Sequence, residues 1–150
     1  MNTFQHKPRG FTFIEVLAVL SMIGLATVGV TLVRDWAMGN ARISEAKAQV
    51  ATLQAGAQLW RPRDGNYSGV SMSALTAIAA LPISWGDGER LNPWGGDVQI
   101  SVDGANQTRY VIEFTGITKP EEGARLARDL AEFATVASFN GDAFSATFQG

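Results

Sequence analysis

A single carboxylate, Glu15, lies near the start of an apolar run that is long enough to cross a bilayer. The run extends from Phe11 to Val33, which is 23 residues, and Glu15 is its only ionisable side chain. A membrane-spanning helix needs about 20 apolar residues. A carboxylate in lipid is costly, so it is usually retained for a task and has a partner. The alternative is a plain membrane anchor that tolerates one glutamate, and the basic leader and the Gly10-Phe11 junction in register with Glu15 argue against it.

Cleavage of the chain between Gly10 and Phe11 would create a charged partner for this carboxylate. A secretory signal is cut after its apolar region, at small residues, whereas Arg9-Gly10-Phe11 precedes the apolar region. Cleavage after Gly10 would remove the charged flank, keep the apolar helix and leave a bare ammonium on Phe11. Glu15 lies one helical turn further along, on the same face. Because a lone buried charge is strongly penalised, Glu15 of one chain would pair with the Phe11 amine of the next and set the register of assembly.

This segment resembles the prepilins of type IV pili and their relatives, the pseudopilins of type II secretion. The matching residues are Gly10, Phe11, Thr12, Phe13, Ile14 and Glu15. The resemblance is close over about residues 6 to 40 and general elsewhere. It implies that a prepilin peptidase cuts between Gly10 and Phe11 and N-methylates Phe11. It also implies that Glu15 takes the assembly role of the family's glutamate.

The resemblance further implies a structural subunit, without catalysis, of a type IV pilus. Its partners would be further copies of itself in a helical homopolymer, the prepilin peptidase, the pilus assembly machinery of the inner membrane, and membrane lipid before assembly. The precursor would cross the inner membrane once with its head in the periplasm, and the assembled pilus would be extracellular. Gly24, Gly29 and the lack of a mid-run proline favour the type IVb kind, whereas the short leader does not. A type II secretion pseudopilin and a minor pilin remain alternatives.

Composition excludes several other classes of function. The 150 residues carry a net charge of −2, and loss of Lys7 and Arg9 with the leader would make it −4. Nucleic-acid binding needs clustered Lys and Arg, so we expect no nucleic-acid partner. The only histidine is His6, in the leader, and there is no cysteine. The mature chain would therefore have no Cys nucleophile, no Ser-His or Cys-His arrangement and no His or Cys metal site, which leaves carboxylate chemistry and a calcium site open. With the pilin resemblance, we predict no catalytic residue and no cofactor. The absent cysteine departs from type IVb pilins, whose heads usually contain a stabilising disulfide.

One long helix is expected to position Glu15, because no proline occurs between Phe11 and Pro62. At 1.5 Å per residue, about 50 residues make a helix of about 75 Å. Its second half carries an apolar stripe at helical spacing. The stripe consists of Trp36, Ile43, Ala46, Val50, Leu53, Ala57 and Trp60. The predicted domains are a cleaved leader over 1–10, a membrane and filament-core helix over 11–33, the amphipathic half of that helix over 34–61, and a globular head over 62–150.

The predicted fold class is α+β, with the long N-terminal helix packed on a small antiparallel β-sheet with a second helix, as in pilins. Turn residues and alternation divide the head into short elements. These are a helix capped by Ser71 or Ser73 and continuing to Leu81, strands over Asp97–Asp103 and Tyr110–Phe114, a helix that starts at a Thr118–Glu121 capping box, has an apolar face through Ala137 and is ended by Gly141, and a strand around Phe144–Phe148.

The turn Asn92-Pro93-Trp94-Gly95-Gly96 has two interpretations. Major pseudopilins have a similar turn near a calcium site, and Asp87, Glu89 and Asp97 lie close in sequence. Calcium takes about six to eight oxygen ligands, and no dense acidic loop is present. A plain turn that anchors Trp94 on the sheet is therefore the preferred interpretation.

Overall fold

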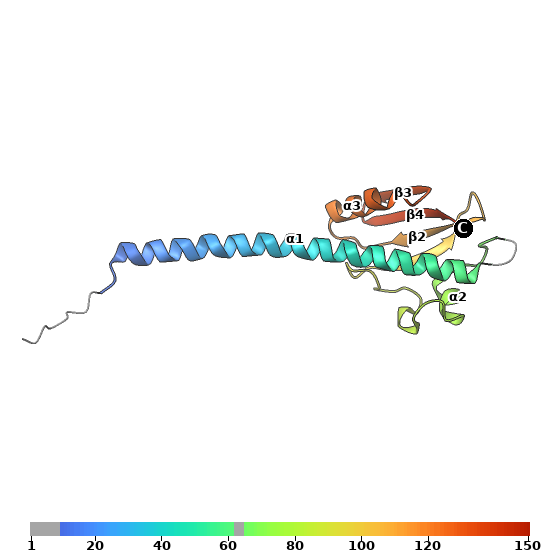
Figure 1. Cartoon of the computed structure of the whole chain (residues 1–150), viewed down its shortest axis with the longest axis horizontal. Helices are drawn as coiled ribbons and strands as arrows, with labels where there is room; N and C mark the ends of the chain where they lie inside the picture. Colours follow the sequence, from blue (N-terminus) through green and yellow to red (C-terminus); the bar gives the residue numbers. More distant parts are fainter. Residues whose placement is uncertain (1–9, 62–64) are drawn as a thin grey trace, which may run out of the picture. The chain divides into compact units, whose positions relative to one another are not determined.

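The structure is a computed structural model that describes residues 10–61 and 65–150. The chain forms two compact units, one ending at Met38 and one comprising Gly39–Gly150, which we call the head. Helix α1, Phe13–Trp60, is the predicted long helix. A four-stranded antiparallel sheet and further short helices complete the head, so the predicted α+β fold class is confirmed (Figure 1). The predicted leader, apart from Gly10, lies outside the described residues.

The first half of α1 is apolar on all sides. Among the described residues, α1 contains the segment that is long and apolar enough to cross a membrane, judged by length and composition. None of its side chains before Gly39 is buried within the chain, and large apolar residues such as Leu25 remain 77% exposed. A helix that is apolar all round needs an apolar environment, which a bilayer or neighbouring helices provide.

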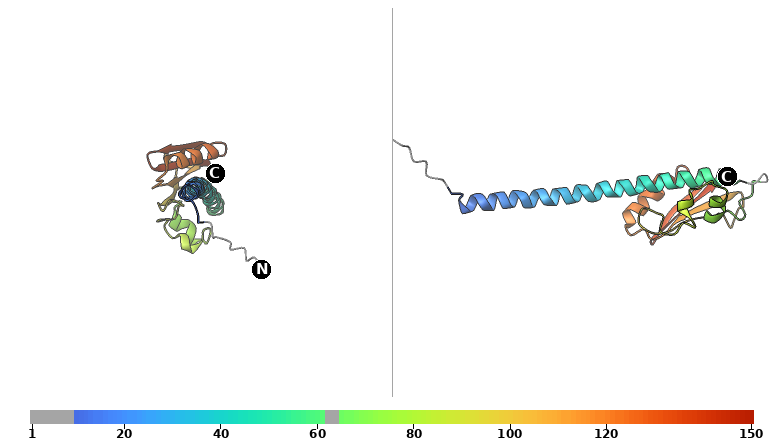
Figure 2. Two further views of the ribbon diagram at one scale, coloured as in Figure 1. Left: turned by 90° about the vertical axis from the view of Figure 1, so that its left-hand side faces the viewer. Right: turned by 90° about the horizontal axis from the view of Figure 1, so that it is seen from below.

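Short helices and four strands follow α1 in the head. They are α2 (Met72–Ala77), the 3₁₀ helix η1 (Ile83–Trp85), β1 (Val98–Val102), β2 (Arg109–Phe114), α3 (Pro120–Leu130), β3 (Val136–Asn140) and β4 (Ala143–Gln149). The strand order is β1-β2-β4-β3, and every neighbouring pair is antiparallel. Within the head, α2 lies on one side of α1, and α3 and β3 lie on the other (Figures 1 and 2).

The predicted apolar stripe of α1 forms one wall of the head core. Its central members are buried, namely Ile43, Ala46, Val50, Leu53 and Ala57. Trp60 is partly buried against this core, whereas Trp36 is 71% exposed. The stripe therefore begins to pack only where the head begins.

The opposite wall comes from one face of the sheet. In β1, β2 and β4 the alternate residues are buried, as period-two patterning predicts. Ile112 stands opposite Ile100 on β1 and Ala146 on β4, which fixes the register of the apolar face. Tyr110 stacks on Phe148 with ring centroids 5.8 Å apart, and its burial raises its pKa to about 12.

Three boundaries differ from the sequence predictions. Ser71 caps α2 as predicted, but α2 ends at Ala77 rather than Leu81, because Ala79 adopts a positive φ of 56° that breaks the helix. The predicted capping box at Thr118–Glu121 is wrong. The N-cap of α3 is Lys119, without a side-chain cap, and the proline one residue later starts the helix.

Residues 136–140 were predicted to be helical and instead form strand β3. Ala137 continues the helical spacing of Leu126, Leu130 and Ala134, which predicts a helix there, but pairing with β4 overrides it. A hairpin signal is present in the sequence: Gly141 opens a two-residue loop before β4 and has a φ of 64°, which glycine adopts without strain. The sheet therefore has one more strand than predicted, and α3 ends at Leu130 instead of near Ala137.

Candidate functional site

The predicted cleavage junction lies outside any regular element. Gly10 and Phe11 have no secondary structure, and α1 begins two residues later, at Phe13. Gly10 is exposed, a Cβ added there would meet nothing within 4 Å, and Phe11 is 88% exposed. A peptidase needs an accessible bond, and the bond between these two residues is exposed and lies outside regular secondary structure.

Glu15 lies in the first turn of α1 and forms a capping box with Thr12. Thr12 N donates to Glu15 Oε2 at 2.7 Å, and Glu15 N lies 3.4 Å from Thr12 Oγ1 as its reciprocal donor. The first amides of a helix lack partners inside the helix, and the box supplies the Thr12 amide with an acceptor. The Glu15 amide also donates to Thr12 O at 3.1 Å, so Thr12 Oγ1 is a second acceptor for it. The Thr-x-x-Glu signature was present in the sequence at 12–15, and the sequence analysis missed it.

Phe11 and Glu15 line one shallow apolar hollow along the start of α1. Its volume is about 320 Å³, and its other lining residues are Val16, Val19 and Leu20. Glu15 provides the only ionisable side chain of that lining. Phe11 and Glu15 therefore border the same hollow within the N-terminal unit. Phe11 lies before the first residue of α1, whereas the sequence analysis placed it at the start of the helix.

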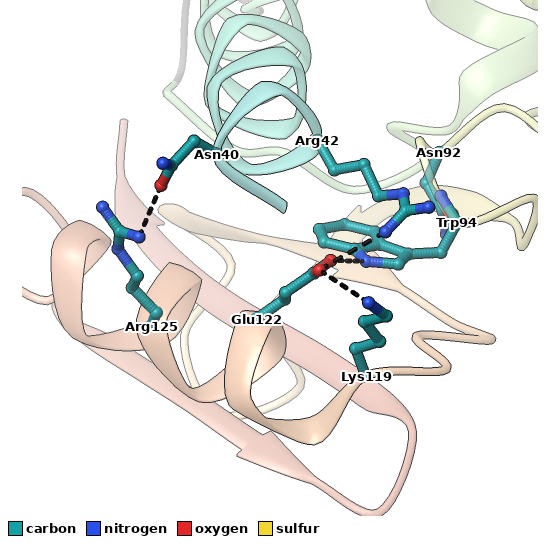
Figure 3. Close-up of polar contacts among 7 residues, drawn as sticks. All are labelled: Asn40, Arg42, Asn92, Trp94, Lys119, Glu122 and Arg125. Carbon is teal, nitrogen blue, oxygen red and sulfur yellow. Dashed lines mark hydrogen bonds and ion pairs between the residues drawn. The ribbon is translucent and has the colours of Figure 1, made fainter. Parts of the chain in front are cut away.

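A second polar cluster, which we call the α1–α3 seam, joins the two helices within the head (Figure 3). Its contacts are Arg42 with Glu122, Lys119 with Glu122, Asn40 with Arg125, and Lys47 with Asp129. The sequence analysis assigned no role to these residues, because the three pairs that connect α1 to α3 join residues 80 to 85 positions apart in the chain.

Glu122 is the buried centre of the seam, with only 6% of its surface exposed. Its Oε2 accepts from the indole Nε1 of Trp94 at 2.5 Å, and its Oε1 lies 3.3 Å from Arg42 Nη1 and 3.9 Å from Lys119 Nζ. A buried carboxylate is tolerated when it is paired and hydrogen-bonded, and both conditions hold here. The carboxylate therefore joins α1, α3 and the turn that carries Trp94.

Gly39 makes the close approach to Glu122 possible. A Cβ on Gly39 would lie 2.8 Å from Glu122 Oε1, which is closer than real side chains come. The glycine therefore leaves room for the Glu122 carboxylate against α1 at the residue where the head begins. Gly24 and Gly29, in the first half of α1, have nothing within 4 Å of such an atom.

The outer end of the seam is an ion pair between Lys47 Nζ and Asp129 Oδ2 at 2.5 Å. The hydrogen bond from Lys47 lowers the pKa of Asp129 below its ordinary value. A lowered carboxyl pKa stabilises the folded head at pH values above the unfolded-state pKa. That contribution is lost as the pH falls through the folded-state pKa. Both side chains are partly exposed, so the contribution is small.

The Asn92 turn is held by its own side chain. Asn92 Oδ1 accepts from Trp94 N and Gly96 N, each at 3.0 Å, and its Nδ2 donates to Thr115 O at 2.7 Å. Of the three nearby acidic residues, Asp97 accepts from Arg90 N and Asp87 accepts from Glu89 N. In the part of the chain that the structure describes, no group of three metal-binding side chains comes together. The contacts thus describe a turn that anchors Trp94.

Replacement of Glu122 by alanine is expected to destabilise the head by about 2 kcal/mol. The indole N–H of Trp94 would lose a charged acceptor, and hydrogen bonds to charged groups contribute about 1.5–3 kcal/mol. Arg42 and Lys119 are partly exposed, so water would solvate them. Denaturant unfolding followed by tryptophan fluorescence measures the effect. Glu121→Ala, on the same turn and exposed, is the control and should change stability little. Equal stability of the two variants would contradict this role for Glu122.

The comparison with protein families identifies the head. The family model described as Bundlin matches residues 36–146, and the chain has the fold expected of such a protein. The chain belongs to the bundlin family. This is a family of type IV pilin-like proteins that includes bundlin of the bundle-forming pilus. A search of curated proteins and a search of solved structures each found no match.

Membership in the bundlin family makes this chain a pilin, a pilus subunit from a structural family and not from an enzyme family. The predicted resemblance to type IV pilins is confirmed. The family match begins at Trp36, after the apolar segment, so it lies almost entirely in the head and does not include Gly10–Glu15, the residues that carry the resemblance. The processing residues Gly10 and Phe11, and Glu15, lie outside the matched range and stay predictions.

Proposed function

We propose that this bundlin-family chain is a type IVb-like prepilin that is cleaved between Gly10 and Phe11 and N-methylated on Phe11. The mature subunit is held in the inner membrane by residues 11–33, with its head in the periplasm, and is then polymerised into an extracellular pilus. The partners of this route are the prepilin peptidase, the assembly machinery of the inner membrane, membrane lipid and further copies of the chain.

One observation carries the proposal. The exposed Gly10-Phe11 bond lies two residues before an apolar helix, and Glu15 is the only carboxylate in the apolar part of that helix. A leader cut at this bond leaves the helix intact and places a new ammonium beside the hollow that Glu15 lines. Pairing of this ammonium with Glu15 of a neighbouring subunit would neutralise two charges that are costly to bury alone. We infer that this pair sets the axial register of the filament.

Processing is tested by replacing Gly10 with valine. The peptidase is expected to require a residue without a side chain before the cut, so Gly10→Val should remain as uncleaved precursor in the membrane. Mass spectrometry of wild-type filaments should show a chain that starts at Phe11 and is heavier by one methyl group. A mature N-terminus at any other residue would refute the proposed processing.

Electron microscopy of cells with and without the gene tests the destination of the subunit. Surface filaments that disappear on deletion support a pilus. A block in protein secretion, with no surface filament in the wild type, would instead support the pseudopilin alternative. A deletion that shortens or reduces the filaments without abolishing them would indicate a minor pilin.

A further inference from the structure

The carboxylate assigned to assembly already has a partner in its own chain. Glu15 Oε2 accepts from the backbone N–H of Thr12 at 2.7 Å, which is the distance of a strong, charge-assisted bond. The Thr12 hydroxyl oxygen faces Glu15 N at 3.4 Å, so the two residues hold one another reciprocally. These contacts come from a single subunit and require no filament.

We propose that Thr12 is a positioning residue for Glu15, and that the capping box satisfies the carboxylate while the subunit is alone in the membrane. This inference rests on the proposed assembly role of Glu15. A glutamate side chain has several rotatable bonds, and fixing it normally costs conformational entropy. The capping box already fixes the Glu15 side chain in the isolated subunit, so this loss of entropy precedes the binding of a neighbouring subunit. The carboxylate is thereby held in place at the start of α1.

The geometry also leaves the carboxylate available for a second charge. Among residues 10–61 and 65–150, the contacts of Glu15 involve Oε2, and none of these residues donates to Oε1. The helix start carries partial positive charge from its unpaired amides, which keeps a carboxylate there favourable. The ammonium of a neighbouring chain would therefore meet an oriented carboxylate whose second oxygen is open.

Substitutions at Glu15 separate the two functions of its side chain. Glu15→Gln keeps an oxygen acceptor for Thr12 N–H, and glutamine is the other residue that completes a capping box. It removes the charge that a neighbouring ammonium needs. Glu15→Val removes both the acceptor and the charge. The box therefore predicts a different state of the isolated subunit for these two variants.

Hydrogen–deuterium exchange of the Thr12 amide, measured by NMR on the full-length precursor in detergent micelles, tests the box directly. We expect wild type and Glu15→Gln to be similarly protected, and Glu15→Val to exchange roughly tenfold faster, because only valine removes the oxygen that accepts from the Thr12 amide. Equal exchange in wild type and Glu15→Val would overturn the inference. The measurement involves no filament, so its outcome is separate from that of the proposed assembly role.

Filament yield tests whether the box supports assembly. Thr12→Val, which lacks the hydroxyl, should give normally processed subunit but several-fold less sheared filament, whereas Thr12→Ser should restore the wild-type yield. Thr27→Val is the matched control, because the Thr27 hydroxyl donates to Ile23 O at 2.8 Å in the same helix and does not contact Glu15. Normal yield from Thr12→Val, or an equal loss from Thr27→Val, would overturn the positioning role.

Discussion

Cells that carry Glu15→Val as their only copy of the subunit are expected to contain processed protein in the membrane and no filaments. The proposed cleavage site, the Gly10-Phe11 bond, lies before the helix that carries Glu15, so cleavage should continue. Each incoming subunit would bring an N-terminal ammonium with no carboxylate to meet it. Breaking a buried pair by removing one partner costs about 3–5 kcal/mol, and the loss recurs at every subunit.

Membrane fractionation followed by shearing of the cell surface measures this outcome. The control is Glu15→Asp, which keeps the charge on a shorter side chain and should retain part of the filament yield. Glu15→Gln should fail as Glu15→Val does, because the pair needs a charge and not only an oxygen. If the segment were a plain membrane anchor in which Glu15 has no role, the Glu15→Val subunit would insert into the membrane better than wild type and function normally. Wild-type filament yield from that strain would refute the register role.

The long helix and its buried stripe could be predicted from the sequence because both follow from local rules. The absence of proline sets the length of α1, and the spacing of Ile43, Val50 and Leu53 sets the face that packs. The strands β1, β2 and β4 alternate clearly, so their inward residues were also predictable. Each of these predictions needs only the residues of one element.

The features of the fold that could not be predicted from the sequence depend on contacts between residues that are far apart in the chain. Residues 136–140 continue the apolar helical spacing of α3 through Ala137 and become strand β3 through pairing with β4. Glu122 looks like one of several acidic residues on α3 until Trp94 and Arg42 are brought to it by the fold. The box at Thr12 and Glu15 is different, because its signature is local and was readable.

The resemblance to prepilins rests on the first 40 residues, and the family match rests on the head. The two findings overlap only at residues 36–40 and agree on a pilin. The absence of cysteine removes the disulfide that related heads usually contain, and such a bond typically contributes about 2–4 kcal/mol. The packing of α1 on the sheet must therefore provide more of the stability of this head than it would in a cross-linked one.

Leu53→Ala is accordingly expected to destabilise the head by about 2–5 kcal/mol, the usual cost of emptying a fully buried leucine site. Leu53 is 0% exposed and lies in the buried stripe of α1, within the core cluster that includes Ile112 and Phe114 of the sheet. A loss of this size is a large part of the stability of a domain. Denaturant unfolding of a chain shortened to begin near Asp35, followed by tryptophan fluorescence, measures it.

Leu59 provides the matched control for this substitution, because it is on the same helix and is 74% exposed. Leu59→Ala should change the free energy of unfolding by about 0.5 kcal/mol or less, as surface substitutions usually do. The two variants lose the same atoms and differ only in burial, so the difference between them isolates the contribution of packing. A head that unfolds at the same denaturant concentration in both variants would mean that the stripe of α1 does not hold the head together. In that case the stability of this cysteine-free head would have to come from the sheet and the α1–α3 seam.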